Sequence, residues 1–133
     1  MIVDSSAVVA ILIDETDGPD LERTLLADPA PVMSAATLLE SHIVMRRRFG
    51  EVGVSKVDRL VREAGIRVVM VDEVQARAAS RGHAAFGRGS KHPARLNYGD
   101  CFSYALAITR DEPLLFKGDD FVHTDVRRVP SGR

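Results

Sequence analysis

The stretch MIVDSSAVVAILI, residues 1–13, sets a pattern that the rest of the chain repeats. The three apolar residues before Asp4 can form a short buried strand. An apolar run with helical spacing then extends from Ser5 to about Ile13, with Asp4 or Ser5 as its N-cap. The stretch therefore predicts a strand that leads directly into a helix, with a carboxylate at the junction.

Short apolar runs and helical segments alternate to the end of the chain. Further strands are predicted at 31–33, 67–71, 114–116 and, at the sheet edge, 126–129. Further helices are predicted at 17–27, 35–49, 54–64, 73–85 and 100–110, and 86–99 is predicted to be a loop. This order predicts an α/β domain with a short, mostly parallel central sheet and helices on both faces.

Length and composition fit one soluble domain covering residues 1–133. The chain is 45% apolar and 28% charged, as ordinary globular proteins are. A single cysteine allows no intramolecular disulfide, and no apolar run approaches the roughly 18 residues of a membrane span. The amino terminus has no basic segment typical of a signal peptide. We therefore expect a cytoplasmic protein without a membrane partner.

The formal net charge of −1 conceals an acidic and a basic region. Residues 1–40 contain eight acids and one base, whereas residues 74–99 contain five bases and no acid. Two solvated faces of opposite sign would explain this distribution. An acidic metal pocket beside a basic wall for a polyanion would explain it equally well.

Several carboxylates are predicted to lie at one edge of the sheet, beyond the carboxyl ends of the strands, where ligands bind in open parallel sheets. They are Asp4 after the first strand, Glu40 less than two turns into its helix, Asp100 at the start of a helix, and Asp119 and Asp120 after the strand 114–116. Converging carboxylates repel one another unless a cation neutralises them, and hard oxygen ligands suit Mg²⁺ or Mn²⁺. An ion held in this way can activate water for phosphodiester cleavage.

Each carboxylate also has a structural explanation when taken alone. Asp4 and Asp100 are good N-caps, and Glu40 can be a solvated surface residue. Asp119 and Asp120 can be turn residues. On this alternative, the chain is a small α/β protein-binding module whose acids are helix caps.

A receiver-like protein is the rival enzyme class, because receivers also gather acids and Mg²⁺ at strand ends. Such a protein needs a phosphate-accepting aspartate after a central strand. We expect residues 67–71 to form the central strand, and Asp72 after it has the position of a helix cap.

Four segments carry a resemblance to a known family. They are MIVDSSA at 1–7, Glu40 in the third helix, NYGDCFSYA at 97–105 and LLFKGDDF at 114–121. In order and spacing they resemble PIN-domain ribonucleases, and most closely the VapC-type toxins of bacterial toxin–antitoxin pairs. The resemblance covers essentially the whole chain, and GDCF at 99–102 is its most specific part.

This resemblance implies a single PIN-like domain with magnesium-dependent endoribonuclease activity, with Mn²⁺ as the alternative ion. It also implies neutralisation by a cognate VapB-type antitoxin and a homodimer. Asp4, Glu40 and Asp100 match the three acidic positions of the family's metal site, and Ser5 matches a small hydroxyl residue that supports it.

The fourth acidic position is matched less well. Many members have Thr-x-Asp after the last inner strand, where this chain has Lys117, Gly118 and Asp119. We align Asp119 with that aspartate and keep Asp120 as the alternate. The implied roles are metal binding by Asp4, Asp100 and Asp119, with Glu40 as a further ligand or as the group that orients the attacking water.

Basic residues near these acids are candidates for contact with RNA phosphates. Arg88, Lys91 and Arg95 lie in the loop that leads into Asp100. Arg47 lies nearly two turns beyond Glu40 on the same helix face, and a solvated helix end explains it equally well.

Overall fold

The computed structural model describes residues 1–130. Its elements are β1 (Ile2–Val3), α1 (Ser5–Leu12), α2 (Gly18–Ala27), β2 (Val32–Ser34), α3 (Ala35–Phe49), α4 (Glu51–Ala64), β3 (Arg67–Val69), α5 (Glu73–Phe86), α6 (Tyr98–Arg110) and β4 (Leu114–Leu115). The strands form one parallel sheet in the order β3-β2-β1-β4. The predicted α/β class and the parallel sheet are therefore confirmed.

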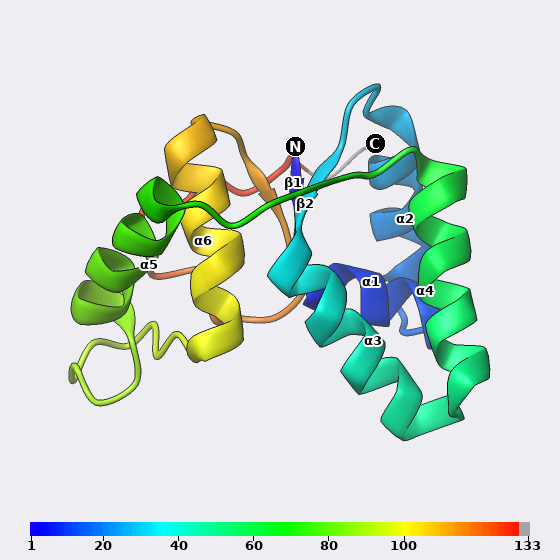
Figure 1. The fold of residues 1–133 in the computed structure, drawn as a ribbon, viewed down its shortest axis with the longest axis horizontal. Coiled ribbons are helices and arrows are strands. Elements are labelled where there is room, and N and C mark those ends of the chain that lie inside the picture. Colours follow the sequence, from blue (N-terminus) through cyan, green and yellow to red (C-terminus); the bar gives the residue numbers. More distant parts are fainter. Residues whose placement is uncertain (131–133) are drawn as a thin grey trace.

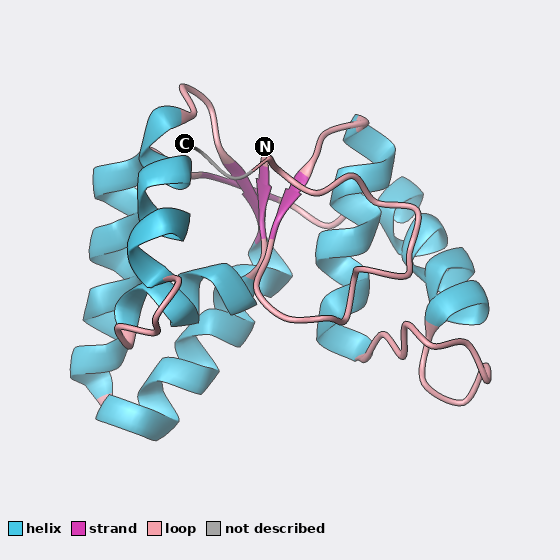
Figure 2. Ribbon diagram, turned by 180° about the vertical axis from the view of Figure 1, so that it is seen from behind, coloured by secondary structure: helices cyan, strands magenta, loops and turns pink. Residues whose placement is uncertain are grey.

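Helices cover both faces of this sheet, as predicted. Helices α1 to α4 pack on one side, and α5 and α6 pack on the other (Figures 1 and 2). Successive strand residues point to opposite faces, so the sheet contributes to two apolar cores. Val3 and Leu115 belong to the core beneath α1 to α4, whereas Ile2 and Leu114 belong to the core beneath α6.

Side-chain caps begin three of the helices, as the sequence predicts. Asp4 accepts a hydrogen bond from the Ser6 amide at the start of α1, and Asp72 accepts one from the Gln75 amide at the start of α5. Ser34 caps α3 in the same way. Each cap satisfies an amide that has no partner inside its helix, so the junctions at the carboxyl ends of β1 and β2 are fixed locally.

The strand predicted at 67–71 is shorter than expected and is not central. Strand β3 pairs only with β2 and ends at Val69, and Met70 beyond it is 81% exposed. The inner strands are β1 and β2. A β-branched run identifies a strand, but it carries no information about which neighbours that strand pairs with.

Three local predictions need correction. Helix α6 begins at Tyr98 with Asn97 as its N-cap, so Asp100 is the third helical residue and not the first. Helix α4 begins at Glu51, three residues before the predicted start. Residues 126–129 form a single bridge, from Arg128 to the last strand, in place of an edge strand.

Within residues 1–130, no helix is both long and apolar enough to cross a membrane.

Candidate active site

Asp4 is a buried carboxylate at the end of an inner strand, with only 1% of its surface exposed. Its Oδ2 accepts hydrogen bonds from the Ser6 amide at 3.0 Å and from the Ser6 hydroxyl at 2.6 Å. Its Oδ1 accepts a hydrogen bond from the Ser103 hydroxyl at 2.6 Å. Asp4 is therefore an N-cap, as the structural explanation holds, and it is also fixed from the opposite side of the sheet by α6.

Glu40 lies beside Asp4 and against the first turn of α6. The Ser5 hydroxyl donates a 2.6 Å hydrogen bond to its Oε1. A Cβ atom on Gly99 would overlap the Glu40 carboxylate, and its three nearest atoms would all belong to that group. Burial, and then the charge of Asp4, raise the pKa of Glu40, although the bond from Ser5 opposes this shift.

Asp100 completes a capping box at the start of α6. It is 7% exposed, its Oδ2 accepts from the Asn97 amide at 3.0 Å, and its own amide donates to Asn97 Oδ1 at 2.8 Å. Burial is the main cause that raises the pKa of Asp100 to about 7, and the charges of Asp4 and Asp120 act in the same direction. Asp100 therefore lies within range of the charges of both Asp4 and Asp120.

The acid that contacts Asp100 from the last segment is Asp120, the alternate in the sequence alignment. The charge of Asp120 adds to burial and to the charge of Asp4 in raising the pKa of Asp100. Among the interactions within residues 1–130, none links the side chain of Asp119, which is exposed, to another carboxylate. The structure thus brings together Asp4, Glu40, Asp100 and Asp120, which we call the acidic cluster.

The acidic cluster is not balanced by protein cations. Its hydrogen-bond donors are serine hydroxyls and backbone amides, and no Lys or Arg within residues 1–130 forms a salt bridge with any of the four. No three acids in this range are already close enough to form a metal-ligand group. The two buried acids, Asp4 and Asp100, and the raised pKa values of Glu40 and Asp100 fit a hard divalent cation, which needs few protein ligands and keeps several waters.

A basic cleft adjoins the acidic cluster. It has a volume of about 660 Å³ and is lined by Arg88, Gly89, Lys91, His92, Pro93, Arg95 and Asp120. Because Asp120 belongs to both features, three of the predicted RNA-binding residues lie beside the acids. Arg47 is exposed in the last turn of α3 and is not part of the cleft lining.

Several residues that shape the site were not assigned a role from the sequence. Ser103 lies one helical turn after Asp100, and Thr37 lies one turn before Glu40, so the spacing of three residues was a usable signal. Thr37 and Ser103 are hydrogen-bonded to each other at 3.1 Å. Ser6 stands in the MIVDSSA motif without an assigned function.

Lys117 occupies the position at which many PIN-domain proteins have threonine. Its amide donates a 3.0 Å hydrogen bond to the Ser6 hydroxyl. Its ammonium group pairs with Asp17 at 2.7 Å and with Glu15. Asp17 stands at the N-cap position of α2, but its side chain makes no cap bond and instead accepts from Lys117.

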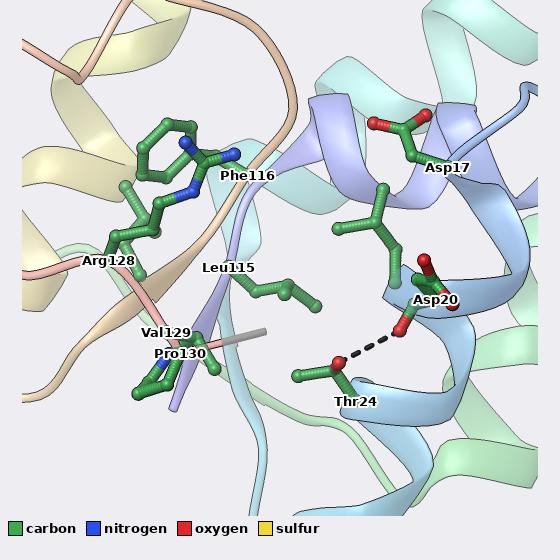
Figure 3. Close-up of a pocket in the computed structure, with 10 residues that line it drawn as sticks. Asp17, Asp20, Thr24, Leu115, Phe116, Arg128, Val129 and Pro130 are labelled. Atoms are coloured by element: carbon green, nitrogen blue, oxygen red, sulfur yellow. Dashed lines mark hydrogen bonds between the residues drawn. The ribbon is translucent and has the colours of Figure 1, made fainter. Parts of the chain in front are cut away.

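A second, smaller cavity of about 130 Å³ lies between α2 and β4 (Figure 3). Thr24 donates to the Asp20 carbonyl at its wall, and Arg128 lies over the ring of Phe116 at 4.7 Å from the ring centroid. None of the four acids lines it. The cavity is therefore separate from the acidic cluster.

Comparison with known proteins identifies the family. The PIN domain family model matches residues 1–127. The chain is 49% identical over 129 residues to Ribonuclease VapC of Mycolicibacterium smegmatis, covering 97% of this chain and 99% of that protein. It is 50% identical over 127 residues to Ribonuclease VapC42 of Mycobacterium tuberculosis, covering 96% and 97%.

A solved structure shares the fold. Mycobacterium tuberculosis VapC20, described as a Sarcin-Ricin loop cleaving toxin, superposes with a TM-score of 0.77 and 17% identity over 96% of this chain and 97% of that one. The fold and the sequence matches define a PIN-domain protein. The chain belongs to the VapC ribonucleases of that family. The receiver-like and protein-binding alternatives are therefore set aside.

Gly99→Ala should destabilise the protein through one specific contact, the one with Glu40. We expect a loss of about 1–3 kcal/mol in the free energy of unfolding, because the added methyl group meets the Glu40 carboxylate. In a Glu40→Ala background the same change should cost nothing, since alanine is the better helix former. Urea unfolding of the four proteins checks this. An equal cost in both backgrounds would contradict it.

Asp100 should make the metal-free protein less stable as the pH rises. An acid whose pKa is raised by folding keeps its proton in the folded state at pH values where the unfolded chain has lost it. The free energy of unfolding therefore falls as the pH rises from 3.8, the ordinary pKa, to about 7, the pKa in the folded protein. In EDTA, Asp100→Asn should match the wild type near about pH 4 and exceed it near about pH 8 by on the order of 2–4 kcal/mol.

The control for this pH dependence is Glu22→Gln, which removes an exposed acid and should leave the curve unchanged. Unfolding by urea across the pH range provides the measurement. If the wild type and Asp100→Asn keep a constant difference in unfolding free energy from about pH 4 to about pH 8, the assignment of the pKa shift to Asp100 is wrong.

Proposed function

We propose that the protein is a magnesium-dependent endoribonuclease toxin, with Mn²⁺ as the alternative ion. The observation that carries the proposal is the acidic cluster, whose four carboxylates come from four segments, lie within range of one another's charges and form no salt bridge with a Lys or Arg of residues 1–130. Burial, and then the charges of neighbouring acids, raise the pKa values of Glu40 and Asp100, and a hard cation would stabilise the ionised forms of both. The family assignment supports ribonuclease activity, and the metal dependence is the part that we add.

In this proposal the acids divide into ligands and a proton acceptor. Asp4, Asp100 and Asp120 hold the ion directly or through water, and Asp120 replaces Asp119 because it contacts Asp100. The bound ion would lower the pKa of water and stabilise charge on the phosphodiester. Glu40 orients the attacking water and accepts its proton, a role that its raised pKa suits.

The basic cleft supplies the contact with the RNA backbone. Arg88, Lys91 and Arg95 line it together with Asp120, so a strand whose phosphate reaches the acids also passes the three cations. Lys and Arg bind phosphate oxygens without reading the base sequence. The cleft therefore favours contact with the RNA backbone and leaves the choice of sequence to other contacts.

The family assignment also supports a VapB-type antitoxin as the partner that neutralises the enzyme. A basic side chain of such a partner would complement the acidic cluster, which lacks a cation of its own. The helices α1, α2 and α3 are our candidates for its docking groove. The homodimer stays a prediction of the resemblance, and the cytoplasmic location stays a prediction from the sequence composition.

Mg²⁺-dependent cleavage of RNA tests the proposed function directly. We expect the wild type to cleave with Mg²⁺ and to be inactive in EDTA. Asp100→Asn should lose at least about 10²-fold in rate, because it removes a ligand while keeping the acceptor for the Asn97 amide. Asp120→Asn should lose as much, and Asp119→Asn should stay within about threefold of the wild type. Equal cleavage by the wild type and Asp100→Asn would exclude this site.

Removing the three cations of the basic cleft should weaken RNA binding and its salt dependence together. Each phosphate contact contributes about 0.7 to the slope of log K against log salt for single strands, so the triple variant Arg88→Ala, Lys91→Ala, Arg95→Ala should lower that slope by about 2. Fluorescence anisotropy at several salt concentrations provides the measurement. Arg62→Ala, an exposed change on α4, is the control. An unchanged slope in the triple variant would place the RNA elsewhere.

A further inference from the structure

Ser103 joins the acidic cluster to the interior of the protein. Its side chain is fully buried on α6, at 0% exposure, and its hydroxyl lies 2.6 Å from Asp4 Oδ1. Thr37, which is 1% exposed at the start of α3, lies 3.1 Å from the same hydroxyl on the other side. The two hydroxyls connect α3 and α6 at the point where both helices meet the end of β1.

The direction of these hydrogen bonds follows from proton counting. A serine hydroxyl has one proton and two lone pairs, whereas an ionised carboxylate can only accept. Ser103 gives its proton to Asp4, so in the bond between the two hydroxyls it must be the acceptor, and Thr37 must be the donor. The result is a directed chain from Thr37 through Ser103 to Asp4.

The other carboxylate oxygen of Asp4, Oδ2, accepts a hydrogen bond from a second directed chain. The Lys117 amide donates to the Ser6 hydroxyl, and that hydroxyl donates to Oδ2. The Ser6 amide is a second donor to the same oxygen. Each carboxylate oxygen has about two lone-pair sites, so Oδ2 is saturated, and among the bonds within residues 1–130 the one lone pair left is on Oδ1.

We propose that Ser103, oriented by Thr37, is a positioning residue that presents Asp4 to a divalent cation through Oδ1 alone. A carboxylate with two free oxygens could rotate or bind an ion through both. Here the rotation is blocked from both sides, and a single lone pair remains for the ion. The proposal rests on the proposed function for the identity of the ligand, and on the hydrogen bonds for the orientation of Asp4.

Three variants separate positioning from packing. Ser103→Ala removes the donor to Asp4, and Thr37→Val removes the second link with a side chain of similar shape. Ser41→Ala is the matched control, because Ser41 is also a fully buried hydroxyl, at 0% exposure, but donates to the Thr37 carbonyl and not toward Asp4. Thr37→Val and Ser41→Ala each remove one buried neutral hydrogen bond, so their effects on unfolding should be similar, whereas Ser103→Ala removes a donor to a buried carboxylate and should cost more.

The test measures the affinity of the metal-free protein for Mn²⁺. Calorimetry or the paramagnetic resonance of the free ion reports the binding. Partners of a metal ligand typically affect affinity by about 10–100-fold, so Ser103→Ala should weaken Mn²⁺ binding by about 10-fold and Thr37→Val by about threefold. Ser41→Ala should leave the affinity unchanged. Saturating Mg²⁺ should restore the RNA cleavage rate of Ser103→Ala to within about threefold of the wild type.

A second readout does not depend on metal. The carboxyl ¹³C signal of Asp4 in the metal-free protein should shift in Ser103→Ala and in Thr37→Val, and it should not shift in Ser41→Ala. If Ser103→Ala binds Mn²⁺ as tightly as the wild type, the hydroxyl is only structural and the proposal is overturned. If the wild type itself neither binds Mn²⁺ nor cleaves RNA, the proposed function fails, and the Asp4 signal alone decides whether Ser103 positions the carboxylate.

Discussion

The hydrogen bonds to Asp4 hold an ionised group inside the protein at the end of β1. Burying a carboxylate is costly unless donors replace its water, and here the donors are two serine hydroxyls and one amide at the start of α1. The partial positive charge of that helix terminus lowers the cost further. Because the donors come from α1 and α6, on opposite faces of the sheet, the position of both helices is tied to this one side chain.

The rest of the acidic cluster follows from parallel topology. Strands β1, β2 and β4 all end at the same edge, so residues far apart in the sequence meet there. Gly99 then lets the first turn of α6 approach Glu40 without a side chain between them. The consequence is that Glu40 and Asp100 have raised pKa values, which reduce the stability of the metal-free protein, a cost that functional sites commonly carry.

Sequence reasoning succeeded where the signal is local. The junction at Asp4 and the cap at Asp72 depend on a few neighbouring residues, and the structure confirms both. The prediction that residues 67–71 form the central strand was wrong, because strand order depends on how helices cross the sheet and not on the composition of the strand. The choice between Asp119 and Asp120 depends on the turn at Gly118. The backbone φ of Gly118 is +93°, a value that no pattern of side chains predicts.

The substitution at Lys117 shows how a site can tolerate a departure from a family motif. Its side chain is 34% exposed in salt bridges with Asp17 and Glu15, and such pairs contribute little to stability. Its contribution to the acidic cluster is the backbone amide, which donates to the Ser6 hydroxyl and so to Asp4. A main-chain donor is present whatever the side chain. The missing threonine therefore leaves the orientation of Asp4 intact, provided that Ser6 keeps its hydroxyl.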